Sequence, residues 1–203
     1  MKIIETRSAP NPRRVRIFLA EKGLEVAFEE VDLMAGALRT AGFTALNPLQ
    51  RVPVLVLDDG TAIAESVAIC RYFEELHPEP ALFGRGARGR ALVEMWSRRV
   101  ELSLFLPIAF VFRHLHPKMA SLEVPQVPAW GEANRAKTLE FLKIMDGRLG
   151  GSPFVAGDEP SIADITALVA VDFMKPAKIV RPEELANLDR WHRMMSARPS
   201  AAA

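Results

Sequence analysis

The segment 52–66 contains the residues whose types and spacing best suit the binding of a small peptide. Its apolar run 54–57 is followed by an Asp-Gly turn and a return segment, a pattern that predicts a β-hairpin. Glu65 and Ser66 come next, at the start of an expected helix, where free backbone N–H groups and the positive end of the helix dipole attract an anion. We therefore expect these two side chains to bind a ligand; the alternative is that they only cap the helix.

The start of the hairpin offers main-chain groups to the same ligand. Pro53 has no N–H, so the chain before it cannot form a regular ladder of hydrogen bonds. The N–H and carbonyl of Val52 are therefore expected to lack partners within the sheet. An extended peptide beside Val52 can bond to both groups.

The overall composition excludes several classes of partner. With 26 basic and 25 acidic residues the net charge is +1, so no global field favours nucleic acid or an anionic membrane. The longest apolar run, 102–112, is interrupted by Ser103 and Pro107 and is shorter than the ~20 residues of a membrane helix. A single cysteine and a charged amino terminus without a secretory signal are typical of a cytoplasmic protein. We expect no nucleic-acid partner and no membrane partner.

The order of expected elements divides the chain into two domains, 1–80 and 91–203. The first has the order β-α-β-α-β-β-α, which is typical of one mixed sheet covered by helices. The second lacks strand alternation and reads as helices only. The expected strands lie at 2–5 and 25–33 and in the hairpin, and the expected helices at 13–23, 35–46, 65–77, 91–116, 129–149, 162–173 and 182–195. Between the domains, the Gly- and Arg-rich segment 81–90 predicts a flexible linker.

Five groups of residues together resemble the cytosolic glutathione transferases, with the likeness pointing to bacterial members that are Nu-like or unclassified. They follow the family's order and spacing over nearly the whole chain: Arg14-Val15-Arg16 with Glu21-Lys22-Gly23, Asn47 to Leu55, Asp59-Gly60 with Glu65-Ser66, Phe154 to Asp158, and Ser161 to Asp164. The resemblance implies an α/β thioredoxin-like N-terminal domain, an all-α C-terminal helical bundle, and a homodimer.

The resemblance also implies a glutathione site in the first domain. Val52 would pair its main chain with the cysteinyl part of glutathione, and Pro53 would be cis. Glu65 and Ser66 would hold the γ-glutamyl end, and Arg51 would meet a carboxylate.

Arg39 falls where the family often places a basic residue for the glycyl carboxylate. Ala37 and Leu38 differ from the polar residues usual just before it.

The group that stabilises the glutathione thiolate departs from the family's usual hydroxyl. Ala9 stands where several classes have Ser, Ser8 lies one residue earlier, and Asn11 matches the Asn of a Pro-Asn pair in Nu-type members. Lowering a thiol pKa by ~2 units needs about 2.7 kcal/mol, which a charged hydrogen bond of roughly 1.5–3 kcal/mol and a helix N-terminus of up to ~2 kcal/mol together supply. Asn11 and Ser8 are therefore the catalytic candidates; the alternative is that Asn11 is only a turn residue between two prolines.

Three functions are compatible with these residues. The first is conjugation of the glutathione thiolate, as cosubstrate, to an electrophilic small molecule, with a role in detoxification. The second is glutathione-dependent reduction of a disulfide or peroxide, and the third is a non-catalytic interaction module. Cys70 has the helical spacing of a buried core residue, which argues against redox chemistry by the protein's own thiol. We expect no metal, because His114 and His116 are two residues apart and would lie on different sides of a helix.

Overall fold

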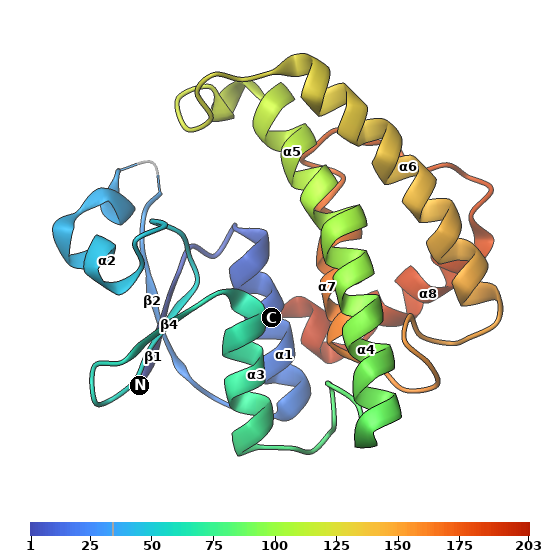
Figure 1. The fold of residues 1–203 in the computed structure, drawn as a ribbon, viewed down its shortest axis with the longest axis horizontal. Coiled ribbons are helices and arrows are strands. Elements are labelled where there is room, and N and C mark those ends of the chain that lie inside the picture. The colour runs from blue at the N-terminus through green and yellow to red at the C-terminus, as the bar shows by residue number, and fades with distance from the viewer. Residues whose placement is uncertain (34) are drawn as a thin grey trace. The chain divides into compact units, whose positions relative to one another are not determined.

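The computed structural model describes residues 1–33 and 35–203. The chain forms two compact units, one of residues 1–81 together with 199–203 and one of residues 82–198 (Figure 1). The first unit is a mixed sheet with helices and the second is all helical, which confirms the fold class predicted from the sequence.

The sheet of the first unit has the strand order β2-β1-β3-β4. β1 pairs in parallel with β2 and antiparallel with β3, and β3 pairs antiparallel with β4. The strands are β1 (Lys2–Glu5), β2 (Ala27–Glu30), β3 (Val54–Val56) and β4 (Ala62–Ala64). The helices are α1 (Pro10–Lys22), the 3₁₀ helix η1 (Ala37–Arg39), α2 (Ala41–Leu46), α3 (Ser66–Leu76) and the 3₁₀ helix η4 (Pro199–Ala202).

Both faces of the sheet are covered by helices. Successive side chains of a strand point to opposite sides, so the apolar strands place side chains to be buried on both faces. Ile4 and Val54 are paired across β1 and β3, and they pack in one cluster with Leu38 of η1 and Phe43 of α2. The opposite face is covered by α1 and α3, which contact each other (Figure 1). Because β4 is an outer strand, the connection from β4 to α3 lies at the edge of the sheet.

The first helix begins at Pro10, three residues before the expected start. Proline is well tolerated in the first turn, because the N–H groups there have no partner within the helix. The helix stops where expected: Gly23 adopts a left-handed conformation with φ of 65°, and the Leu24 N–H donates to the Leu19 carbonyl at 2.9 Å.

The expected second helix is divided in two. Thr40 interrupts it, and its hydroxyl accepts a hydrogen bond from the Phe43 N–H at 3.2 Å, which caps α2. Arg39 therefore lies at the end of η1 instead of inside a longer helix.

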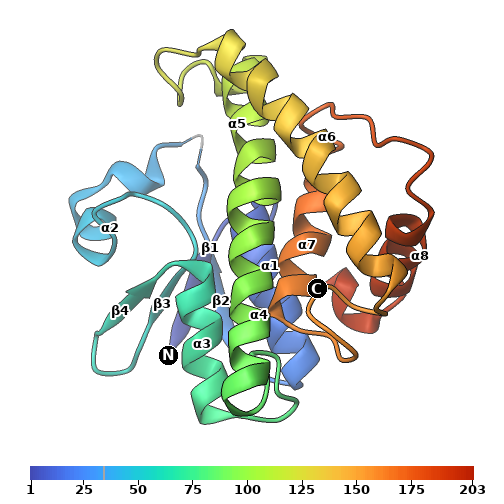
Figure 2. The same cartoon turned by 45° about the vertical axis from the view of Figure 1, so that its right-hand side comes forward.

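The second unit is built around α7 (Ile162–Phe173), which is buried over almost its whole length. The other elements are α4 (Gly86–Val100), a π-helical segment (Glu101–Phe105), α5 (Leu106–Leu115), the 3₁₀ helix η3 (Pro117–Met119), α6 (Pro128–Gly150) and α8 (Ala186–Ser196). Figure 2 shows α4 and α5 running as one long helix through the π-helical segment, with α6 beside α5. No helix among the described residues is long and apolar enough to cross a membrane.

α7 is anchored at its start by Asp164. Its fully buried carboxylate accepts hydrogen bonds from the Val155 N–H, the Ser161 N–H and hydroxyl, and the Trp191 indole, at 2.8–3.0 Å. Burial raises the pKa of Asp164 above its ordinary value, and these donors oppose that shift by stabilising the ionised form. The capping box predicted at Ser161 is therefore also the point where α8 is held to α7.

The segment 81–90 is not a flexible linker over its whole length, because α4 already begins at Gly86. A Cβ atom on Gly84 would lie 2.6 Å from the Gly89 carbonyl oxygen, and Gly84 has a φ of 83°. These glycines permit a close approach of two backbone segments, and the helix can start there for that reason.

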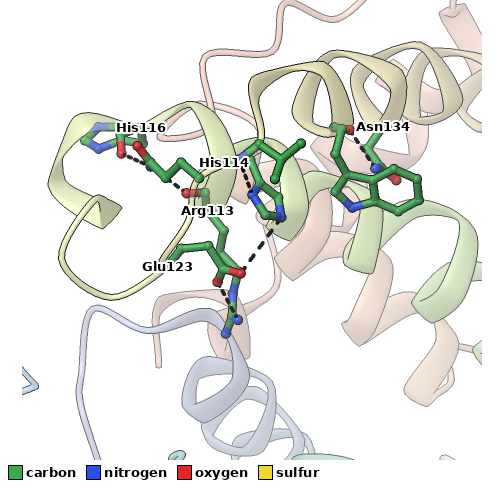
Figure 3. A network of polar contacts seen from close by, with 8 residues as sticks. Arg113, His114, His116, Glu123 and Asn134 are labelled. Carbon is green, nitrogen blue, oxygen red and sulfur yellow. Dashed lines mark hydrogen bonds and ion pairs between the residues drawn. The ribbon is translucent and has the colours of Figure 1, made fainter.

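A polar network at the end of α5 holds the loop before α6 (Figure 3). The Arg113 guanidinium contacts the Glu123 carboxylate at 3.2 Å, and His114 Nδ1 accepts from the Val127 N–H at 3.1 Å. The Gln126 amide donates to the carbonyls of Arg113 and His116 at 2.7 and 3.0 Å. His114 and His116 bond to different residues in this network, Val127 and Gln126. The described residues include no cluster of three potential metal ligands.

Candidate functional site

Glu65 connects β4 to α3 in an unusual backbone conformation. Its φ is 68° and its ψ 114°, a region that residues other than glycine rarely adopt. Its carbonyl accepts from the Ile69 N–H at 2.9 Å, but its exposed carboxylate makes no capping bond and no ion pair among the described residues. The alternative that this side chain caps the helix is therefore wrong.

Ser66 is buried at the first position of α3, and Arg14 fixes its hydroxyl. The Arg14 Nη1 donates to Ser66 Oγ at 2.9 Å, and Arg14 is only 1% exposed. Because the guanidinium uses a lone pair of this oxygen, the hydroxyl hydrogen is left to donate to an acceptor. The first N–H groups of α3 have no partner within the helix and point out of its N-terminal end, where they favour an anionic acceptor.

Arg14 is a site residue that the sequence analysis did not identify. Its partner lies 52 positions away in the chain, so no local pattern connects the two. The available signal was a basic residue among the apolar positions of α1, where a buried charge requires a partner.

Val52 and Pro53 lie beside Glu65 and Ser66. Val54 pairs with Ala64, so Pro53 precedes this pair on one strand and Glu65 follows it on the other. The Val52–Pro53 peptide bond is cis, and the Val52 N–H and carbonyl form no hydrogen bond with the described residues. The structure thus brings together four of the predicted residues, Val52, Pro53, Glu65 and Ser66. They offer the unpaired main-chain groups of Val52, the free carboxylate of Glu65 and the oriented hydroxyl of Ser66.

Arg51 and Arg39 are exposed and form no ion pair within the described part of the chain. The Asn47 side chain holds the loop before Pro53 by donating to the Arg51 carbonyl at 2.8 Å and accepting from the Leu49 N–H at 3.1 Å. The structure shows no ligand contact for either arginine, so each remains a predicted site residue.

The start of α1 contains Asn11 and is preceded by Ser8. Ser8 is exposed in the turn before the helix, and Asn11 is half-buried at the second helical position, so Asn11 is not the loop residue of the alternative interpretation. Pro10 and Pro12 have no N–H, which leaves Asn11 as the one N–H donor among the first three residues of α1. Its side-chain amide has no hydrogen-bond partner among the described residues, so both donors of Asn11 are available.

Cys70 is fully buried in α3. Burial raises the pKa of this thiol to about 12, and the nearby Arg14 charge only partly offsets the effect. Cys70 therefore stays a neutral thiol near pH 7 and is not a nucleophile.

Comparison with known proteins identifies the family. Residues 9–76 match the N-terminal domain of glutathione S-transferases and residues 106–199 match the C-terminal domain. The chain is 38% identical to glutathione S-transferase 2 of Saccharomyces cerevisiae, over 98% of this chain and 87% of that protein. This chain belongs to the glutathione S-transferase family.

Solved structures agree with this assignment. The glutathione transferase superimposes on the crystal structure of Gtt2 from Saccharomyces cerevisiae with a TM-score of 0.95 at 38% identity, covering 100% of this chain and 99% of that one. It superimposes on a glutathione S-transferase domain-containing protein from Marinobacter aquaeolei VT8 with a TM-score of 0.96 at 39% identity, covering 98% and 99%. The resemblance stated from the sequence motifs is therefore confirmed, and the chain is a glutathione transferase.

Proposed function

We propose that this glutathione transferase joins the thiolate of glutathione to an electrophilic small molecule, in the cytoplasm and as part of detoxification. The observation that supports the site is the strained, unpaired Glu65 beside the unpaired main chain of Val52. Such strain persists only where the surrounding structure enforces it, and it occurs preferentially at ligand sites. Glutathione has two carboxylates, an ammonium and a peptide backbone, which match these groups.

Each group of glutathione has a partner in this proposal. Glu65 pairs with the γ-glutamyl ammonium, and the Ser66 hydroxyl with the first N–H groups of α3 binds the adjacent carboxylate. Val52 bonds its main chain to the cysteinyl part. Arg51 and Arg39, which have no ion pair among the described residues, bind the glycyl carboxylate. No metal is required, because the chemistry is attack by a thiolate that the protein holds and orients.

Asn11 stabilises the thiolate in this proposal. Its N–H and its side-chain amide are two free donors at the positive end of α1. Replacing Asn11 with alanine is expected to raise the thiol pKa of bound glutathione by about 1–2 units, because one hydrogen bond to a charged group is worth roughly 1.5–3 kcal/mol. The ultraviolet absorbance of the thiolate in the complex, followed against pH, measures this shift.

Ser8→Ala is the matched control for Asn11→Ala. Ser8 is exposed and precedes the helix, so its loss should leave the pKa unchanged. A pKa shift in Ser8→Ala without one in Asn11→Ala would show that Ser8, and not Asn11, stabilises the thiolate. The affinity for glutathione should stay nearly constant in both variants.

Rates with two kinds of substrate test the reaction itself. The wild-type protein should react faster with an aromatic halide than with a small disulfide at equal glutathione concentration. A faster reaction with the disulfide would favour the reductase function, and the absence of both reactions together with retained glutathione binding would favour a non-catalytic module.

We further propose that the protein is a homodimer in which the first domain of one subunit faces the helical domain of the other. Arginines of α4 suit such an interface: the Arg99 guanidinium stacks 4.8 Å from the Trp96 ring centroid, and Arg88 and Arg90 are exposed without ion pairs among the described residues. Sedimentation equilibrium should give about 45 kDa, twice the chain mass of 22.5 kDa. A single species of the chain mass at micromolar concentration would contradict the dimer.

A further inference from the structure

A buried ion pair joins β1 to α1 within the first unit. Glu5 is the last residue of β1 and Arg16 lies in the middle of α1, and their side chains are only 4% and 8% exposed. The Arg16 Nη1 pairs with the Glu5 carboxylate, and its Nη2 donates to the carbonyl of Arg7 at 2.9 Å. One guanidinium therefore connects the end of the strand, the turn that follows it and the helix after the turn.

The stability that such a pair supplies does not explain its presence. Moving two charges out of water costs about as much as their attraction returns, so apolar residues of similar volume often stabilise a protein equally well. The Arg16 Nε is also buried without a hydrogen-bond partner among the described residues, which adds a further cost. Apolar side chains, however, cannot hold a carbonyl group at a fixed point. The contact with the Arg7 carbonyl therefore indicates what the pair does.

The turn that Arg16 holds leads into a helix start without a side-chain cap. Ala9 is the N-cap residue of α1, and it has no side chain that can accept a hydrogen bond. The Ala9 N–H donates to the Thr6 carbonyl at 2.9 Å, and the Ala9 carbonyl accepts from the Arg13 N–H at 3.3 Å. The first turn of α1 is therefore positioned from outside the helix, by this turn and by the guanidinium that holds it.

We infer that Arg16 is a positioning residue for the glutathione thiolate and acts through Asn11. By holding the Arg7 carbonyl, Arg16 keeps the first turn of α1, and with it both donors of Asn11, at a fixed place relative to β1. Hydrogen bonds weaken steeply when their geometry is lost, so a displaced first turn stabilises the thiolate less. This role rests on the proposed function, in which Asn11 donates to the thiolate of bound glutathione.

The paired substitution Glu5→Leu/Arg16→Met tests this role without leaving a buried charge unpaired. It replaces both charged groups with apolar side chains and releases the Arg7 carbonyl. The thiol pKa of bound glutathione, followed by ultraviolet absorbance, should rise by about 0.5–1 unit, a part of the 1–2 units expected for Asn11→Ala. The affinity for glutathione should stay nearly constant. A purely structural role would lower the free energy of unfolding and leave the thiol pKa unchanged.

Arg16→Lys is a second variant that keeps the positive charge beside Glu5. Lysine lacks the planar fork that reaches two acceptors at once, so it cannot hold both the Glu5 carboxylate and the Arg7 carbonyl in the same way. The thiol pKa should shift in the same direction as in the paired variant, by a smaller amount.

Lys22→Met/Glu74→Leu is the matched control, because it removes the buried ion pair at the other end of α1. The Lys22 ammonium contacts the Glu74 carboxylate at 2.5 Å. It also donates to the carbonyls of His77 and Pro80, at 2.7 and 2.6 Å, so this pair too is joined to the backbone. The control variant should leave the thiol pKa unchanged even where it lowers the free energy of unfolding.

A combination with Asn11→Ala shows whether Arg16 acts through Asn11. When Asn11→Ala and Glu5→Leu/Arg16→Met are combined, the thiol pKa should rise by less than the sum of the separate shifts, because the side-chain donor is already absent. The inference is overturned if the Glu5/Arg16 variant leaves the pKa unchanged, if the Lys22/Glu74 variant shifts it as much, or if the separate shifts add in full. An unchanged pKa in Asn11→Ala itself would instead overturn the proposed role of Asn11, and the role of Arg16 with it.

Discussion

The Asp164→Ala variant is expected to lose at least about 3 kcal/mol in the free energy of unfolding. The carboxylate is fully buried and accepts four hydrogen bonds, and its removal leaves the Val155 N–H and the Trp191 indole without a partner. Each unsatisfied buried donor costs about 1–3 kcal/mol, and loss of the helix cap adds about 1 kcal/mol. Urea denaturation followed by tryptophan fluorescence measures the change.

A graded series sharpens this test. Asp164→Asn keeps one acceptor oxygen and should fall between the wild type and Asp164→Ala. Asp158→Ala, at an exposed aspartate in the same loop, should change the free energy of unfolding by less than about 0.5 kcal/mol. A loss of less than 1 kcal/mol in Asp164→Ala would show that the four hydrogen bonds do not hold this unit together.

Replacing Glu65 with alanine is expected to weaken glutathione binding at least about 30-fold. Truncating one partner of a hydrogen-bonded charge pair costs about 2–5 kcal/mol when the pair is shielded from water, as the γ-glutamyl ammonium would be in the complex. Retention on immobilised glutathione and calorimetric titration measure the loss. Undiminished binding would refute the proposed glutathione site.

Glu65→Gly separates the function of this residue from its cost in stability. Glycine adopts a φ of 68° without strain. This variant should therefore bind glutathione as weakly as Glu65→Ala does, but its free energy of unfolding should be higher than that of Glu65→Ala. Glu75→Ala is the control, because Glu75 is an exposed carboxylate near the other end of α3. It should leave both binding and stability unchanged.

Local chemistry made several elements predictable from the sequence. The helix 162–173 was predicted with the bounds that the structure shows, because Ser161 and Asp164 form a capping box before a long apolar run. The strand 2–5 and the hairpin follow from their apolar runs and the Asp-Gly turn. The pairing of Val54 with Ala64 then places Val52 beside Glu65, so this part of the candidate site could be anticipated.

Contacts between distant residues could not be anticipated in the same way. Arg14 reaches Ser66 only after α1 and α3 have packed on the same face of the sheet, and nothing in either segment indicates the other. The start of α4 was placed too late because Gly84 and Gly89 indicated a flexible loop, whereas their backbones approach each other closely. The helix α1 begins at Pro10 and not at Arg13, where its start was expected because the apolar spacing begins only there. Pro10 and Pro12 suit a loop as well as a first helical turn.

The two prolines around Asn11 also have a spectroscopic consequence. Since neither Pro10 nor Pro12 has an amide proton, the first three residues of α1 contribute a single backbone signal to a ¹H–¹⁵N correlation spectrum, that of Asn11. The side-chain NH₂ of the same residue gives a separate pair of signals. Isotope labelling of asparagine alone therefore observes both donors directly in this protein, without interference from neighbouring residues of the turn.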